Sequence, residues 1–85
     1  MRQPAEHFEE EELHLVYIAG RLREATDLEQ VLTEHSLDYL VETDTYSGGV
    51  VFRSARVGAF FYVREADLDR TRAAIEKRGY KPYKV

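Results

Sequence analysis

The chain contains no cysteine among its 85 residues. It therefore has no disulfide framework, no thiolate nucleophile and no cysteine-based metal site. No apolar run is long enough to span a bilayer. Residues 1–12 are acidic and lack the apolar stretch of a signal peptide. We therefore expect a cytoplasmic protein with no membrane partner.

The chain also lacks a net positive charge, and its formal charge is -4. Residues 1–12 and 13–52 carry -4 and -5, whereas residues 53–85 carry +5. The acidic total argues against a dedicated nucleic-acid binder. The uneven distribution is typical of two ordinary solvated surfaces, or of a contact with a partner or a second copy of complementary charge.

Motifs that would indicate catalysis or metal binding are also missing. The three histidines, His7, His14 and His35, show neither HxH nor HxxxH spacing, so we predict no metal site and no cofactor. The serines have no neighbouring base and no nucleophile-elbow motif. We predict no catalytic residues and a protein that is not an enzyme.

The length of the chain indicates one domain. Residues 9–12 are four consecutive glutamates, a like-charge block that repels itself and has nothing to bury. We therefore predict that residues 1–12 form a flexible acidic tail and that residues 13–85 form the single folded domain.

Hydrophobic periodicity predicts alternating strands and helices. Leu13–Ala19 is apolar on both alternating faces, which favours a strand inside a sheet. The next predicted elements are a helix over 22–35, or from the capping box at Thr26, a strand over 37–46 and a turn at 47–49. A return strand over 50–63 is interrupted at 53–56 by a bulge, a bend or a short loop. A helix over 65–78 closed by Gly79 and an edge strand over 80–85 complete the order. Gly58 within the return strand predicts a bulge or a close backbone approach.

This order is an α+β, ferredoxin-like βαββαβ two-layer sandwich. We predict a four-stranded antiparallel sheet in the order 4-1-3-2 with both helices on one face, because βαβ crossovers are right-handed.

Two stretches resemble a known family. They are Tyr17-Ile18-Ala19 with Leu22, Glu24, Ala25, Leu28 and Leu32, and Phe61-Tyr62-Val63-Arg64-Glu65-Ala66-Asp67 with Ala73 and Ala74. Both are similar to a small prokaryotic family of signal-transducing domains of unknown function that have a PII-like fold. The resemblance covers about residues 13–79 and departs at His35-Ser36, where no glycine precedes the second strand. It implies a regulatory role and supplies no catalytic residues.

Aromatic residues on the predicted sheet allow a different interpretation. Residues 16–20 are similar to the RNP2 strand of RNA-recognition motifs, whereas residues 56–63 fit the RNP1 pattern poorly. Stacking of bases would require Tyr17, Phe60 and Tyr62 to be exposed on adjacent central strands. Sheet packing or an oligomer interface explains the same three aromatics, and we favour that explanation.

Arginines around the predicted hairpin are candidates for an anion site. Arg53, Arg56 and Arg64 would suit phosphate or carboxylate if they converged, and are otherwise ordinary surface residues.

We expect a non-catalytic regulatory or signal-transducing module that acts through self-association, with a dimer favoured, or through a protein or small-ligand partner. The alternative is a nucleic-acid or nucleotide binder that uses the aromatic sheet face.

Overall fold

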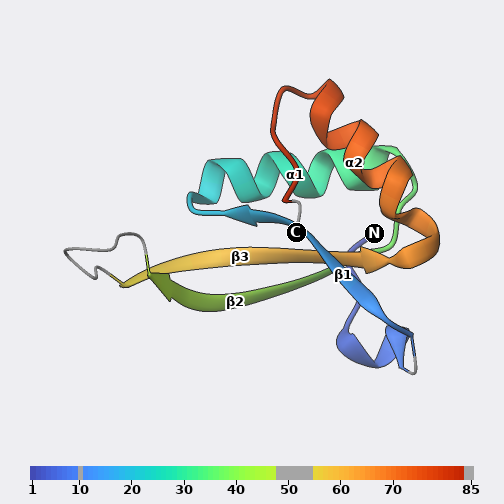
Figure 1. Ribbon diagram of the computed structural model, residues 1–85, viewed down its shortest axis with the longest axis horizontal. Helices are drawn as coiled ribbons and strands as arrows, with labels where there is room; N and C mark the ends of the chain where they lie inside the picture. The colour runs from blue at the N-terminus through green and yellow to red at the C-terminus, as the bar shows by residue number, and fades with distance from the viewer. Residues whose placement is uncertain (10, 48–54, 84–85) are drawn as a thin grey trace.

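The computed structural model describes residues 1–9, 11–47 and 55–83 (Figure 1). This part of the chain forms a small α+β domain with two α-helices and a three-stranded antiparallel sheet. The elements in chain order are the 3-10 turn η1 (Ala5–Phe8), β1 (Leu13–Ala19), α1 (Leu22–Glu34), β2 (Leu40–Ser47), β3 (Ala55–Arg64), the 3-10 turn η2 (Glu65–Asp67) and α2 (Leu68–Lys77). The prediction of two helices and an antiparallel sheet is confirmed.

The sheet has the order β1-β3-β2, so β3 is its central strand. These three strands have the predicted relative order. The predicted fourth strand would lie beside β1, where the amide of Tyr83 donates a hydrogen bond to the Val16 carbonyl at 2.6 Å. Residues 80–83 form no strand, and residues 84–85 lie outside the described part of the chain. What is established is the three-stranded sheet.

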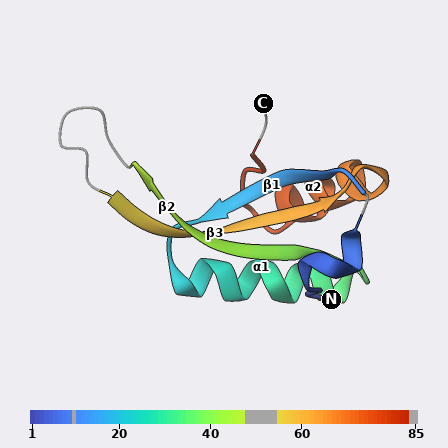
Figure 2. The same cartoon turned by 90° about the horizontal axis from the view of Figure 1, so that it is seen from below.

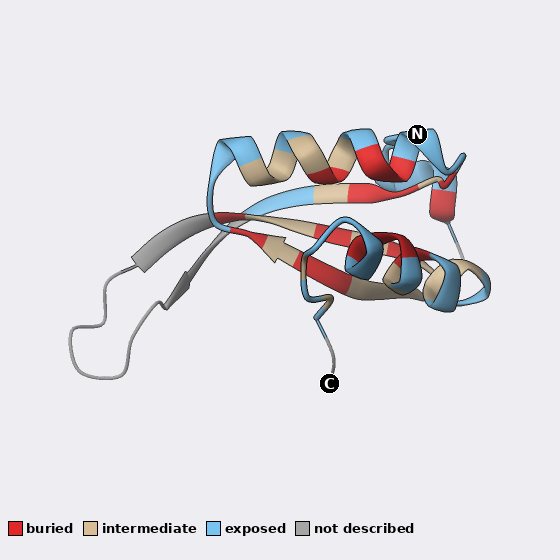
Figure 3. Ribbon diagram, turned by 90° about the horizontal axis from the view of Figure 1, so that it is seen from above, coloured by how far each residue is buried: buried red, intermediate tan, exposed pale blue. Residues whose placement is uncertain are grey.

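Both helices lie on one side of the sheet, and η1 lies on the other (Figures 1 and 2). The buried parts of the helices face the sheet (Figure 3). Leu28 and Leu32 of α1 and Ile75 of α2 pack in one core with Phe61 and Val63 of β3. Burying this apolar stripe against the sheet is what stabilises two helices of such modest length.

The helix ends explain how the chain leaves each helix toward the core. Ser36 (φ 56°) and Gly79 (φ 101°) each have a left-handed backbone just after a helix. The amide that directly follows each of these two residues donates a hydrogen bond to the carbonyl five residues before it. The distance is 2.9 Å at the end of α1 and 3.1 Å at the end of α2. This is the Schellman arrangement. The predicted helix end at Gly79 is confirmed, and α1 begins at Leu22 rather than at the capping box.

A register shift interrupts the pairing of β1 with β3. Leu15 pairs with Tyr62, but Tyr17 pairs with Phe61, so Val16 is an extra residue on β1. The bulge is therefore on β1, and the prediction of a bulge at Gly58 is wrong, because Gly58 pairs in continuous register with Asp44. The extra residue reverses the alternation of side chains along β1.

Candidate functional site

The side of the sheet opposite the helices carries a set of apolar residues that we call the open face. Alternation along β3 places Phe60 and Tyr62 there, because Phe61 between them packs in the helix-side core. Their register partners on β1 lie on the same side. The open face consists of Leu13, Leu15 and Ile18 on β1 and Phe60 and Tyr62 on β3, all half-buried. On β2, the register adds the buried Leu40 beside Tyr62 and the exposed Glu42 beside Phe60.

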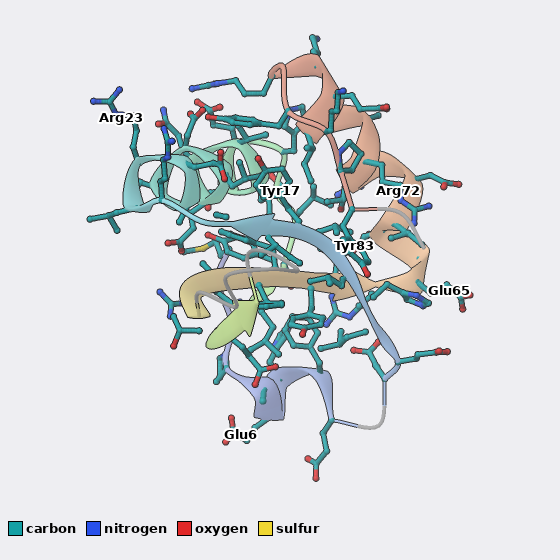
Figure 4. All side chains as sticks on the ribbon, turned by 60° about the vertical axis from the view of Figure 1, so that its left-hand side comes forward. Glu6, Tyr17, Arg23, Glu65, Arg72 and Tyr83 are labelled. Atoms are coloured by element: carbon teal, nitrogen blue, oxygen red, sulfur yellow. The ribbon has the colours of Figure 1, made fainter. Side chains whose placement is uncertain are left out.

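Tyr17 does not lie on the open face. It pairs with Phe61, is only 8% exposed, and packs edge-on against Tyr80 with ring centroids 5.6 Å apart. Figure 4 shows Tyr17 between the sheet and the helices. The structure therefore brings Phe60 and Tyr62 together and places Tyr17 on the other side of the sheet. Burial, with the nearby Glu24 carboxylate, raises the pKa of Tyr17 to about 12.

The N-terminal segment, residues 1–9, packs against the end of the open face near Arg64. Phe8 is 3% exposed and lies under the Arg64 guanidinium, 4.9 Å from the ring centroid. The amide of Gln3 donates to the Tyr39 carbonyl at 2.8 Å. The predicted flexibility of residues 1–12 concerns motion, and it stays a prediction. The hydrophobic periodicity of the sequence did not indicate that Phe8 packs against the domain.

A polar network joins this segment to the sheet. Arg64 bonds Glu11 at 2.7 Å, lies 3.6 Å from Asp38, and approaches His7 Nε2 at 3.1 Å. His7 Nε2 also lies 3.3 Å from Asp38 Oδ2. This nitrogen either accepts from Arg64 or, when it carries a proton, donates to Asp38. Either hydrogen bond ties the N-terminal segment to the rest of the domain, through Arg64 on β3 or through Asp38 before β2.

The charges in this network shift the pKa values of its members. Partial desolvation raises the pKa of Asp38, but hydrogen bonds from Gln3 and His7 and the positive N-terminal amine together hold it below its ordinary value. The hydrogen bond to Glu11 raises the pKa of Arg64. Both groups are therefore stabilised in their charged forms.

The three arginines of the predicted anion site are placed differently. Arg64 is engaged with Glu11 and Asp38. Arg56 stands at the other end of β3, eight residues away, or about 26 Å at about 3.3 Å per residue. The Arg56 side chain and all of Arg53 lie outside the described part of the chain. The structure thus does not bring Arg56 and Arg64 together.

A second group of polar residues gathers at the start of β1. Glu12, His14 and Glu65 each offer a ligand atom, and these atoms all lie within 4.8 Å of one another. We call these residues the ligand cluster. The histidine spacing gave no sign of it, because its members come from two chain segments that are far apart in the sequence, the start of β1 and the turn after β3. The signal that would have found it is the pairing of the beginning of one predicted strand with the end of another.

Asp27 of α1 connects the two helices. Its carboxylate accepts from the Tyr80 hydroxyl at 2.7 Å and bonds Arg78. The hydrogen bond to Asp27 raises the pKa of Tyr80. A shallow hollow of about 520 Å³ beside these groups is lined by Leu22, Arg23, Thr26, Asp27, Gln30 and Tyr80. The carboxylate in it already has partners within the chain, which indicates a structural role.

Comparison with known proteins adds no relative to these observations. The chain matches no family model, no curated protein and no solved structure among those searched. Within residues 1–9, 11–47 and 55–83, neither helix has the length and apolar character needed to cross a membrane.

Proposed function

We propose that this chain is a non-catalytic regulatory interaction module that pairs with a second copy of itself through the open face. The observation that carries the proposal is the largely apolar composition of a sheet side that neither helix covers. Phe8 covers its Arg64 end. Ile18 and Phe60 pair four residues further along β3, about 13 Å away at about 3.3 Å per residue. An apolar surface of this kind on a small domain is typical of an interface.

The charge distribution favours a second copy over another partner. Residues 13–52 carry -5 and residues 53–85 carry +5, so the two charges balance within one domain. A strongly acidic or strongly basic partner would match only one of the two segments. A second copy offers one segment of each sign, and a two-fold arrangement sets opposite signs against each other.

The expected affinity is moderate. Covering about 400 Å² of apolar area per subunit contributes on the order of 10 kcal/mol at about 25 cal/mol/Å². Lost translational and rotational freedom offsets much of this gain. We therefore expect a dimer with a dissociation constant in the micromolar range.

Sedimentation equilibrium at several protein concentrations tests the proposal. The wild-type mass should rise from the monomer value of 9.9 kDa toward twice that value. Ile18→Lys places a charge on the open face, away from the end that Phe8 covers, and should leave a folded monomer. The matched control is Leu22→Lys, since Leu22 is 84% exposed on α1, on the other side of the sheet.

The result that contradicts the proposal is a wild-type protein that stays monomeric up to high micromolar concentration. Dimerisation that survives Ile18→Lys, with circular dichroism showing an intact fold, would place the contact elsewhere. Loss of the dimer in Leu22→Lys alone would move it to α1.

The fold that we propose for the complete chain is the ferredoxin-like plan, with residues 80–85 as a fourth strand beside β1. The hydrogen bond from Tyr83 to Val16 supports this position. The same plan supports the proposed similarity to PII-like signalling domains, because such domains share this order of strands and helices.

The nucleic-acid alternative stands second. Its stacking platform requires aromatics on two adjacent strands. Phe60 and Tyr62 both belong to β3. The positions paired with them are Leu15 and Ile18 on β1 and Leu40 and Glu42 on β2, none of which is aromatic. A titration with mixed-sequence single-stranded RNA should therefore show no binding at moderate salt.

A further inference from the structure

The ligand cluster is formed by the register of β1 and β3. Leu13 pairs with Arg64 and His14 with Val63, so the next position along places Glu12 opposite Glu65. Glu12 and His14 are two residues apart and belong to the same side of the sheet. Figure 4 shows Glu65 at the turn from β3 into α2, at the opposite end of the molecule from Arg23 at the start of α1. Three side chains from two chain segments therefore meet at one point.

The two carboxylates of this cluster have no cationic partner within residues 1–9, 11–47 and 55–83. In the part of the chain that the structure describes, no ion pair within 4.0 Å reaches Glu12 or Glu65. Their nearest charged neighbours in the cluster are each other. Two carboxylates that face each other across adjacent strands repel, so their arrangement is stabilised when a cation lies between them.

The imidazole of His14 gives independent support. Its Nε2 atom is buried and has no hydrogen-bond partner among the described residues, and one nitrogen of the ring lies within 4.8 Å of an oxygen of each carboxylate. Buried polar atoms are normally satisfied, and one without a partner calls for an explanation. An ion bound at Nε2 would supply the missing partner, and Nδ1 would then carry the proton of the neutral ring.

We propose that Glu12, His14 and Glu65 bind a divalent first-row transition ion such as Zn²⁺. An imidazole with two carboxylates suits these ions, whereas Ca²⁺ and Mg²⁺ prefer sites made of oxygen alone. Three protein ligands leave at least one position for water or for a group from another molecule. The site lies on the helix side of the sheet, since His14 pairs with the core residue Val63, and is therefore separate from the open face.

The three ligand atoms need to move only a short distance toward one another to surround an ion. Ligand atoms about 2.1 Å from a tetrahedral ion lie about 3.4 Å from one another. The three atoms are within 4.8 Å of one another without an ion. Glu12 and Glu65 are exposed, so their side chains are able to rotate and close this difference without moving the strands.

Isothermal titration of the full chain with Zn²⁺ tests the site. The result expected is one ion per chain, with His14→Gln and Glu65→Gln each weakening binding by at least about tenfold. The matched control is His35→Gln, since His35 is exposed at the end of α1 and lies outside the cluster. His7→Gln controls for binding near Asp38 and should also bind as the wild type does. Mg²⁺ and Ca²⁺ should bind much more weakly.

A second measurement guards against loss of the fold. Glu12→Gln alters an exposed residue before β1, so the variant keeps the core intact and should also weaken Zn²⁺ binding. In nuclear magnetic resonance spectra, Zn²⁺ should shift the imidazole signals of His14 before those of His35. Wild-type affinity in His14→Gln, or no binding at millimolar Zn²⁺, overturns the proposal.

Discussion

Replacing Phe8 by alanine tests how strongly the N-terminal segment binds to the sheet. Phe8 is 3% exposed although it belongs to a four-residue 3-10 turn, and its ring lies under the Arg64 guanidinium. Burial of a phenylalanine side chain contributes about 1.5 to 3 kcal/mol. The cation–π contact adds about 0.5 to 1 kcal/mol at a partly exposed site.

The expected loss is smaller than the sum of these contributions. Residues 1–9 can detach while the helices and sheet stay folded, so the loss cannot exceed the free energy of docking this segment. Ordering the segment costs backbone entropy, which offsets part of the gain from Phe8. We therefore expect Phe8→Ala to lower the free energy of unfolding by about 2 kcal/mol.

Urea denaturation followed by circular dichroism measures this change. Glu6→Ala is the matched control, because Glu6 is exposed in the same turn and has no part in the packing. Hydrogen exchange supplies a second readout. The amides of Gln3 and Tyr39, which hydrogen-bond between the segment and the chain before β2, should exchange faster in Phe8→Ala.

The reasoning is refuted if Phe8→Ala costs less than about 0.5 kcal/mol and the Gln3 amide already exchanges freely in the wild type. Residues 1–12 would then behave as the flexible tail that their charge pattern predicts. The open face would in that case be accessible along its whole length, and the contact between copies would extend to Leu13 and Tyr62.

Two further predictions concern local backbone and ionisation. Ser36→Gly should raise the free energy of unfolding by about 0.5 to 1 kcal/mol, because glycine adopts the left-handed conformation without strain. Gly79→Ala should lower it by about 1 kcal/mol, although nothing lies within 4 Å of the added methyl group. Thermal denaturation of both variants checks the pair, and equal shifts of the same sign would contradict the prediction. Tyr17→Phe should reduce the loss of stability as pH rises between 10 and 12, because the buried Tyr17 hydroxyl stays neutral in the folded state whereas it ionises near pH 10 in the unfolded chain. Urea midpoints measured across this pH range test the prediction. The same slope of midpoint against pH in both proteins would contradict the buried position of Tyr17.

The sequence predicted the elements of the fold well because their signals are local. The apolar stripe of α1 and the left-handed glycine after α2 depend on residues within one or two turns. The order of β1, β3 and β2 followed from chain connectivity and the handedness rule. The strand predicted over 37–46 begins at Leu40, because Leu37 is buried in the turn that leaves α1.

Which residues share a face of the sheet was harder to predict. Uninterrupted alternation along Leu13–Ala19 would place Tyr17 with Leu13 and Leu15. The extra residue at Val16 reverses the alternation, and its cause is the pairing with β3 rather than anything in the local sequence. A single inserted residue in a strand is invisible to periodicity when both faces of the strand are apolar.

This one bulge connects the two surfaces that we propose to be functional. After Val16, the shifted register sets Ile18 beside Phe60 and places Tyr17 in the core. Before Val16, the register places His14 on the helix side, where Glu12 and Glu65 meet it. Without the bulge, Tyr17 and Ile18 would exchange sides relative to His14, and the polar Tyr17 hydroxyl would replace Ile18 on the open face. The apolar contact between copies and the cation site on the opposite side are therefore compatible in one short strand because the strand changes register between them.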